Sequence, residues 1–346
     1  MIAAVQHRNS SSSPVNLALQ GGGSHGAFTW GVLDALIEHG NLAVEGISGS
    51  SAGAVNAVLM ADGWLRDGPD GARERLAAFW GELGRRGSRG LGFAFGEAAL
   101  QWVAPAGKML ASMLSPAQIN PLDLNPLRDL LVQHVDFEHL RAESPFKLFV
   151  AATEVRTGRL RLFRSHELTA DMVLASACLP RLHHPVEIDG EMYWDGGFSA
   201  NPAVFPLFYE CEAKDVLLVL LSPLSHDDYP RTAEQIQARM AELSFSANFQ
   251  REMQTFVRAA EFVSAHAPGA RSYGVLERRL ADLHFHMIDI SGVETLQRTE
   301  TKLLAHASFL EALHEQGRAR AQDWLEEHRA QVGRASTLDL RHWAMS

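Results

Sequence analysis

The sequence predicts an α/β fold with a mainly parallel central sheet. Residues 15–20 (VNLALQ) form a short apolar run that ends at three glycines, which is typical of a buried strand followed by a loop. Residues 24–39 carry apolar side chains at helical spacing and stop at Gly40. A second strand over 42–48, a tight turn and a second helix beginning at Ala52 come next. This alternation indicates parallel strands joined by crossover helices.

The later part of the chain predicts two hairpins, two further strands and several helices. One hairpin turns at Arg156-Thr157-Gly158, and the other turns at Asp189-Gly190, a strong signal for a type I′ turn. The strands are expected at 146–155 with 160–164, 186–188 with 191–194, 216–221 and 283–290. Helices are expected at 72–85, 170–177, 231–265 and 301–331.

Composition excludes several classes of protein. The chain has 346 residues, of which 46% are hydrophobic and 21% are charged, so a large packed core is expected. Its net charge is −10 at pH 7, which argues against nucleic acid as a partner and against electrostatic docking on anionic lipid.

Cysteine use and the amino-terminal sequence indicate a location in the cytoplasm. Cys178 and Cys211 lie far apart and are too few for a disulfide framework, so a reducing compartment is expected. Residues 1–14 are rich in serine and lack the apolar region of a signal peptide, which predicts a disordered lead-in. The longest apolar runs have the length of strands, so no transmembrane helix is expected. Peripheral contact with a membrane stays open.

Segment 88–121 has few charges and many large apolar residues, interrupted by proline and glycine. It is either an irregular part of the core, or a lid or interfacial patch over an apolar site. The sequence alone leaves both interpretations open.

The sequence Gly49-Ser50-Ser51-Ala52-Gly53 matches G-x-S-x-G between a predicted strand and a predicted helix. A serine at such a sharp turn is exposed for attack, and small residues on either side let the turn close. The amides and the positive dipole end of the following helix favour a developing oxyanion. Ser51 is therefore the candidate nucleophile of a serine esterase.

The glycine loop Gly21-Gly22-Gly23-Ser24-His25-Gly26 contains a second G-x-S-x-G and also a G-x-G-x-x-G pattern. A dinucleotide site would need an acidic residue at the end of the second strand, but Glu45 lies early in that strand. Bare backbone amides that approach a substrate oxygen give the glycines a simpler role. Gly22 and Gly23 are therefore the candidate oxyanion hole.

A serine nucleophile needs a base. None of the sixteen histidines lies in a recognisable catalytic context, and this includes His183, His184, His284 and His286. Asp195 follows an apolar strand and precedes two glycines that permit close backbone approach. A carboxylate can act as the base if its environment raises its pKa sufficiently, so Asp195 is the better candidate. Asp-Gly is also a frequent turn, so a turn residue without a catalytic role is the alternative for Asp195.

Together, the glycine loop, the Ser51 motif and Asp195-Gly196-Gly197 resemble the patatin-like phospholipases. The stretch that begins at Ala175 (ASACLPRLHHPVEIDGEMYWDGG) is similar to the block before that family's catalytic aspartate. The likeness covers residues 15–222 and implies a three-layer α/β/α fold with additional C-terminal helices. It also implies hydrolysis of fatty-acyl esters through a Ser51–Asp195 dyad and a serine acyl-enzyme, with Gly22 and Gly23 binding the oxyanion and with no metal or cofactor.

The chain departs from the family pattern in the glycine loop. The family commonly reads D-G-G-G-x-R-G, whereas Gln20 and His25 stand here at the aspartate and arginine positions. Histidine is mostly neutral at pH 7, so His25 is a weaker candidate for contacting a substrate phosphate than arginine would be. An acyl lipid or another hydrophobic ester is the expected partner. Phospholipids, neutral esters, thioesters and storage polyesters all remain open, as does an acyl-lipid-binding protein without turnover.

The expected organisation has three parts. Residues 1–14 are the lead-in, residues 15–225 form the catalytic domain with the apolar segment 88–121, and residues 226–346 form a mainly helical extension packed on the same domain. The oligomeric state is not indicated by the sequence.

Overall fold

The computed structural model describes residues 14–40, 43–88, 115–121, 123–226, 228–266, 274–291, 293, 301–302 and 304–344. The predicted lead-in lies outside these residues except for Pro14, and most of the apolar segment 88–121, predicted as either core or lid, also lies outside them.

Eight strands of the described chain form one sheet, in the order β5-β6-β3-β2-β1-β7-β8, with β4 paired to β3. Strands β3, β2, β1, β7 and β8 run parallel, whereas β4 and β6 pair antiparallel with β3 and β5 pairs antiparallel with β6. The bounds are β1 Pro14–Leu19, β2 Ala43–Ser50, β3 Lys147–Glu154, β4 Leu160–Arg164, β5 Val186–Ile188, β6 Glu191–Asp195, β7 Asp215–Val219 and β8 His284–Ile288. The mainly parallel sheet and both predicted hairpins are confirmed.

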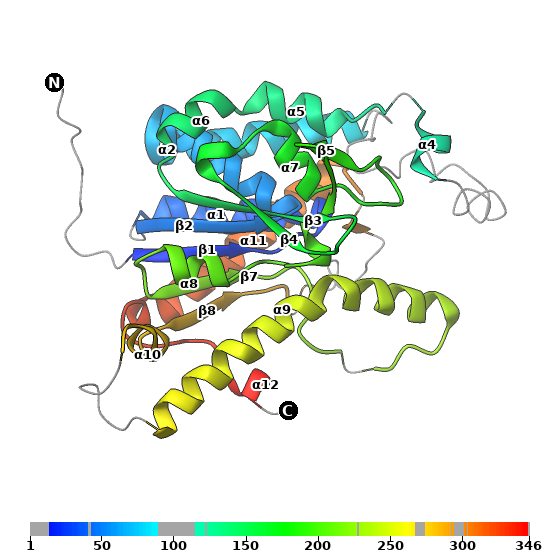
Figure 1. The fold of residues 1–346 in the computed structure, drawn as a ribbon. Helices are drawn as coiled ribbons and strands as arrows, with labels where there is room; N and C mark the ends of the chain where they lie inside the picture. Colours follow the sequence, from blue (N-terminus) through cyan, green and yellow to red (C-terminus); the bar gives the residue numbers. More distant parts are fainter. Residues whose placement is uncertain are drawn as a thin grey trace.

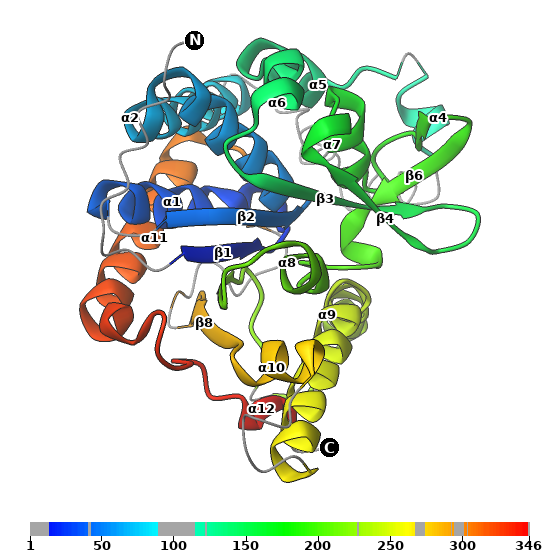
Figure 2. The same cartoon turned by 60° about the vertical axis from the view of Figure 1, so that its left-hand side comes forward.

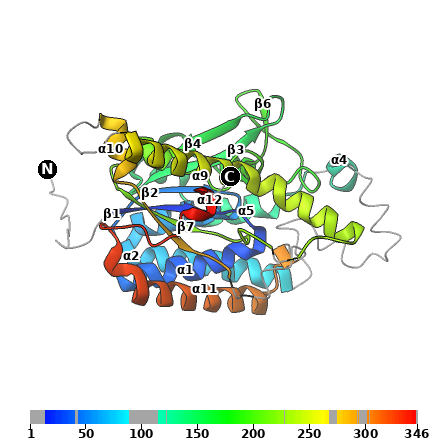
Figure 3. The same cartoon turned by 90° about the horizontal axis from the view of Figure 1, so that it is seen from below.

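Helices cover both faces of the sheet (Figures 1, 2 and 3). One layer contains α1 Gly26–His39, α2 Ala52–Ser88, α5 Pro126–His134, α6 Phe137–Glu143, α7 Ala170–Ser176 and α11 Ala307–His328. The other contains α8 Phe205–Glu210, α9 Ala233–His266, α10 Val275–Ala281 and α12 Arg341–Ala344, while the short α4 Pro116–Ile119 projects beyond the sheet. This is the three-layer α/β/α arrangement that the family resemblance implies.

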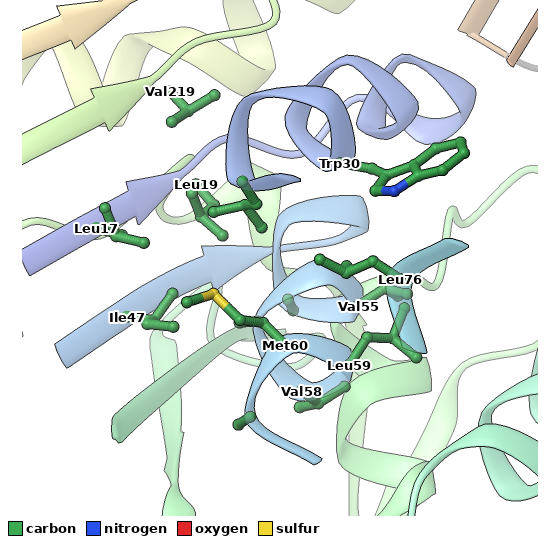
Figure 4. Close-up of a cluster of buried hydrophobic side chains, with 14 of the residues drawn as sticks. Leu17, Leu19, Trp30, Ile47, Val55, Val58, Leu59, Met60, Leu76 and Val219 are labelled. Carbon is green, nitrogen blue, oxygen red and sulfur yellow. The ribbon is translucent and has the colours of Figure 1, made fainter. Parts of the chain in front are cut away.

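The alternation of side chains along the strands explains why the sheet needs both layers. On β7, Leu217 and Val219 pack into the core beneath α1, α2 and α11, whereas Val216 and Leu218 pack into the core beneath α8 and α9. Figure 4 shows Val219 and neighbouring strand side chains facing the apolar residues of α1 and α2. Each such side chain contributes about 1.5–3 kcal/mol when it is fully buried, which is why the central strands are apolar on both faces.

Helix α2 unites two segments that the sequence predicts as separate helices. The chain leaves helical geometry at Asp67 and at Gly68, where φ is +56°, and Pro69 follows at once. Proline disfavours the helical conformation in the residue before it but fits the first turn of a helix, so the break falls here.

The segment after residue 226 belongs to the same sheet and the same layers. Strand β8 pairs with β7, and α11 packs along α1. In the described part of the chain, no helix combines the length and the apolarity that crossing a membrane requires.

A charged network fastens α11 to α1 and α2. Asp34 on α1 is buried and accepts from Arg73 of α2 at 2.5 Å, while His314 of α11 lies 3.1 Å away and Arg318 of α11 also pairs with it. These partners hold the pKa of Asp34 well below its usual range, although burial alone would raise it. The network therefore stabilises the fold above the pH at which an unfolded aspartate titrates, and this contribution is lost as pH falls.

Asp34→Ala is expected to lower the free energy of unfolding by roughly 2–3 kcal/mol, because two partly buried guanidinium groups lose the more buried of the two carboxylates that they share, and only the exposed Glu38 remains. Urea denaturation measures the change. Asp339→Ala, which removes an exposed pair with Arg341, is the control and should have little effect. Equal losses in the two variants would contradict a stabilising role for the network.

Candidate active site

The predicted site residues gather at the carboxyl edge of the parallel strands. The glycine loop follows β1, Ser51 follows β2, and Leu221 follows β7 by two residues. Ligands in open α/β sheets commonly bind at this edge, because the loops that leave adjacent parallel strands meet there. In Figure 1, α4 and the first half of α9 extend beyond the same edge.

Ser51 occupies a strained turn between β2 and α2. Its φ is +53°, a left-handed conformation that non-glycine residues rarely adopt. The flanking glycines are needed because the turn is so tight: a Cβ atom on Gly49 would lie 2.5 Å from the carbonyl carbon of Gly53, and one on Gly53 would meet the carbonyl oxygen of Leu19. The structure thus has the sharp strand-to-helix turn that the G-x-S-x-G pattern predicts.

Neighbouring serines hold this turn. The Ser51 amide donates a hydrogen bond to Ser176 Oγ at 2.9 Å, and Ser50 Oγ donates to the carbonyl of Ala200 at 2.5 Å. Ser51 itself is 9% exposed, so little of its surface meets solvent. Ser176 lies at the end of α7, and no pattern in the sequence marks it as part of the site.

Strand β3 brings Asp195 beside Ser51. Ser50 pairs with Ala151 of β3, and Asp195 of β6 pairs with the next residue, Ala152. Strand β4 pairs with β3 over residues 149–153, and this stretch overlaps both the part of β3 that pairs with β2 and the part that pairs with β6. Since a strand has only two edges, β2 and β6 both pair with the edge of β3 that β4 leaves free, one after the other. The end of β2 and the end of β6 therefore meet, which places the serine and the carboxyl group side by side.

Burial raises the pKa of Asp195 to about 7, while the Gly197 amide and the Ser51 side chain act in the opposite direction. Its Oδ1 accepts from the Gly197 amide at 2.7 Å. Its Oδ2 is buried and has no hydrogen bond of normal geometry among the described residues. The carboxyl group is thus positioned by one oxygen and keeps the other available for a proton.

The glycine loop lies directly on the nucleophile turn. A Cβ atom on Gly21 would come within 2.7 Å of Ser51 Cβ, and the Gly21 amide donates to Asn201 Oδ1 at 2.7 Å. Within the described chain, the amides of Gly22 and Gly23 donate no hydrogen bond. Two unused backbone donors next to Ser51 are what an oxyanion site requires.

Gln20 and Asn201 hold this loop in place through hydrogen bonds. Gln20 Oε1 accepts from the Leu221 amide at 2.5 Å, and its Nε2 donates to the Asn201 carbonyl at 3.3 Å. The glutamine that departs from the family pattern therefore ties the loop to the end of β7. Asn201 could not be recognised from the sequence, because its role depends on a contact between segments 180 residues apart.

Ser24 and His25 are both fully buried. His25 Nε2 lies 2.7 Å from Thr301 Oγ1, so the ring links the glycine loop to a distant segment. Burial, followed by the charge of Lys302, lowers the pKa of His25 to about 3. His25 is therefore a neutral side chain without an exposed surface, which leaves the predicted substrate contact without geometric support.

The histidine and nucleotide alternatives find no support in the described residues. Neither Ser51 nor Asp195 forms a hydrogen bond with a histidine there, and His286 is instead paired with Asp215 at the start of β7. Glu45, at the opposite end of β2 from the glycine loop, accepts from Lys147 and from the amides that precede β7. No cluster of three or more possible metal ligands occurs in the part of the chain that the structure describes.

Comparison with known proteins places this site in a family. The model of the patatin-like phospholipases matches residues 17–208. Curated proteins of the NTE family from Mycobacterium bovis and Mycobacterium tuberculosis are 32% identical over 195 residues, which is 56% of this chain and 46% of theirs. The chain thus spans about half the length of the curated relatives that it matches.

The crystal structure of VipD from Legionella pneumophila is a distant neighbour, with a TM-score of 0.43, 17% identity, and coverage of 92% of this chain and 67% of that one. The family match is the stronger finding, since it takes in more than half of the chain, including the glycine loop, Ser51 and Asp195. The chain therefore belongs to the patatin-like phospholipase family.

Proposed function

We propose that the protein is a lipid acyl hydrolase in which Ser51 is the nucleophile and Asp195 is the general base. The observation that carries the proposal is the adjacency of the strained Ser51 turn to a fully buried carboxyl group whose pKa is raised to about 7. A carboxylate with that pKa can accept a serine proton near neutral pH.

In the proposed reaction, Ser51 Oγ attacks the carbonyl carbon of an acyl ester while its proton passes to Asp195. The oxygen of the tetrahedral intermediate becomes negative and accepts hydrogen bonds from the Gly22 and Gly23 amides. Collapse of the intermediate breaks the ester bond, and Asp195 returns the proton to the departing alcohol. Water then attacks the acyl-serine with Asp195 again as the base, which releases the fatty acid.

The same chemistry serves phospholipids, neutral esters, thioesters and storage polyesters. A protein that only binds acyl lipid would not need a serine held at positive φ against a buried carboxyl group, so this geometry favours turnover. Action in the cytoplasm, with transient contact at a membrane surface, is the setting that we propose from composition.

Covalent labelling with a fluorophosphonate tests the nucleophile. The probe should attach to Ser51, identified by mass spectrometry of the labelled peptide, because an activated serine attacks the phosphorus. Ser24 is the matched control, since it lies in the other G-x-S-x-G motif but is fully buried. Label that survives in Ser51→Ala and disappears in Ser24→Ala would overturn the assignment, and an unlabelled wild type would favour the lipid-binding alternative.

A further inference from the structure

Lys302 lies against the glycine loop, although it comes from a segment far outside the family match. Its backbone carbonyl touches Gly23 so closely that a Cβ atom there would collide with it. Its Nζ donates a hydrogen bond to Ser222 Oγ at 3.3 Å, and Ser222 follows Leu221, whose side chain contacts Gly22. Lys302 therefore sits on the same edge of the sheet as the proposed oxyanion site.

The loop also limits the distance between Lys302 and the nucleophile. Gly21 touches Ser51 and Gly23 touches Lys302. Residues two apart are separated by at most about 7 Å even in an extended chain. The Lys302 backbone thus lies within roughly 15 Å of the Ser51 turn, on the side where the glycine loop borders the space in which the ester would react.

Among the described residues, Lys302 has no counter-ion of its own. None of the ion pairs among the described residues includes Lys302. The carboxylate that influences it is Glu242 of α9, which already lies 2.9 Å from both Arg239 Nη1 and His226 Nε2. Among the described residues, the carboxylate that acts on Lys302 is therefore already engaged by two other basic groups.

An unpaired, poorly solvated ammonium group is costly unless an anion compensates it. Burial lowers the pKa of Lys302, and the charge of Lys302 in turn lowers the pKa of the neutral His25. Lys302 nevertheless keeps part of its surface exposed. A phosphate group would supply the missing negative charge and accept the three N–H groups of an ammonium.

We propose that Lys302 binds the phosphate of a glycerophospholipid whose ester lies at Ser51, so that the site prefers phospholipids to neutral esters of the same acyl chain. This inference rests on the proposed acyl hydrolase function. It assigns the charge-recognising role to a residue of the C-terminal segment and not to His25 of the glycine loop.

A pair of soluble substrates with the same acyl chains tests the inference: dihexanoylphosphatidic acid and dihexanoylglycerol. Lys302→Met is expected to lower the ratio of kcat/KM for the phosphorylated over the neutral substrate by about 10- to 100-fold, mainly through KM. Lys302→Arg should restore most of the ratio. Lys214→Met is the control, since Lys214 pairs with Asp282 away from the site, and it should leave the ratio unchanged. A ratio that Lys302→Met does not change would overturn the inference.

Calorimetry in a Ser51→Ala background separates this inference from the proposed function, because binding needs no turnover. Tighter binding of dihexanoylphosphatidic acid than of dihexanoylglycerol, abolished by Lys302→Met, supports the phosphate site even if wild type hydrolyses neither compound. If Lys302→Met leaves the affinity for dihexanoylphosphatidic acid unchanged, the inference is refuted. Inorganic phosphate distinguishes the source: if it binds as tightly as dihexanoylphosphatidic acid, the site recognises free phosphate and the head-group assignment is wrong. Should Lys302→Met fail to fold, Lys302→Gln takes its place in both assays.

Discussion

Ser51→Ala is expected to lower kcat for a short-chain p-nitrophenyl ester by about 10⁴- to 10⁶-fold, which is the effect of losing the nucleophile in serine hydrolases. The substitution removes the oxygen that forms the acyl-enzyme, so only the oxyanion site and substrate binding remain to accelerate attack by water. The backbone strain of the left-handed turn should stay the same, because alanine is disfavoured at φ +53° just as serine is. Release of p-nitrophenol measures the loss.

Ser24→Ala provides the control for this experiment, and it should keep most of the activity. A melting temperature close to that of wild type must accompany the loss in Ser51→Ala, so that unfolding is not mistaken for loss of the nucleophile. If Ser51→Ala retained a tenth or more of wild-type kcat, Ser51 could not be the nucleophile.

Asp195→Asn is expected to reduce kcat by about 10³- to 10⁴-fold, because an amide cannot take the serine proton. In wild type, kcat should rise with pH through about 7, as Asp195 loses its proton and becomes a base. The residual activity of Asp195→Asn should no longer show this rise.

Glu252 makes a demanding control, because burial also raises its pKa to about 7. It accepts from the Val204 and Phe205 amides at the start of α8 and takes no part in the proposed reaction. Glu252→Gln should therefore retain the rise of kcat near pH 7. If instead Glu252→Gln removed that rise and Asp195→Asn kept it, the assignment of the base would be wrong.

As pH rises through about 7 and Asp195 loses its proton, the stability of the wild type should fall while its activity rises. Between the pKa of an unfolded aspartate, about 4, and the folded value of about 7, the folded protein holds a proton that the unfolded chain has lost. The free energy of unfolding therefore falls as pH rises through this interval and stays lower above it. Asp195→Asn carries no such charge, so its melting temperature should exceed that of wild type at pH 8, with the difference shrinking towards pH 4.

The parts of the site that could be predicted from the sequence are those encoded by short, contiguous patterns. The glycine loop and the Ser51 turn each join a strand to a helix, so the spacing of a few residues is enough to define them. Asp195 stood out because an apolar strand precedes it and two glycines follow. In each of these cases the local chain geometry and the side-chain chemistry lie within the same ten residues.

The remaining site residues depend on contacts between segments far apart in the sequence. Ser176 supports Ser51 across 125 residues, and Asn201 supports Gly21 across 180. Lys302 reaches the loop from the segment before α11, and nothing near it in the sequence indicates a partly buried cation beside the loop. The meeting of β2 and β6 on one edge of β3 is likewise a property of the sheet, which no local pattern specifies.

The central position of β1 in the sheet has a consequence for how the chain can be divided. The family match ends at residue 208, but the partner that covers one side of β1 is β7, which starts at Asp215. A fragment that stopped at the family boundary would turn this strand, the middle one of the five parallel strands, into a bare edge with unpaired amides and carbonyls and no covering layer from α11. Such an edge is a template for aggregation, so we expect that the region of the family match does not fold on its own, and expression of this protein should retain the residues up to α12.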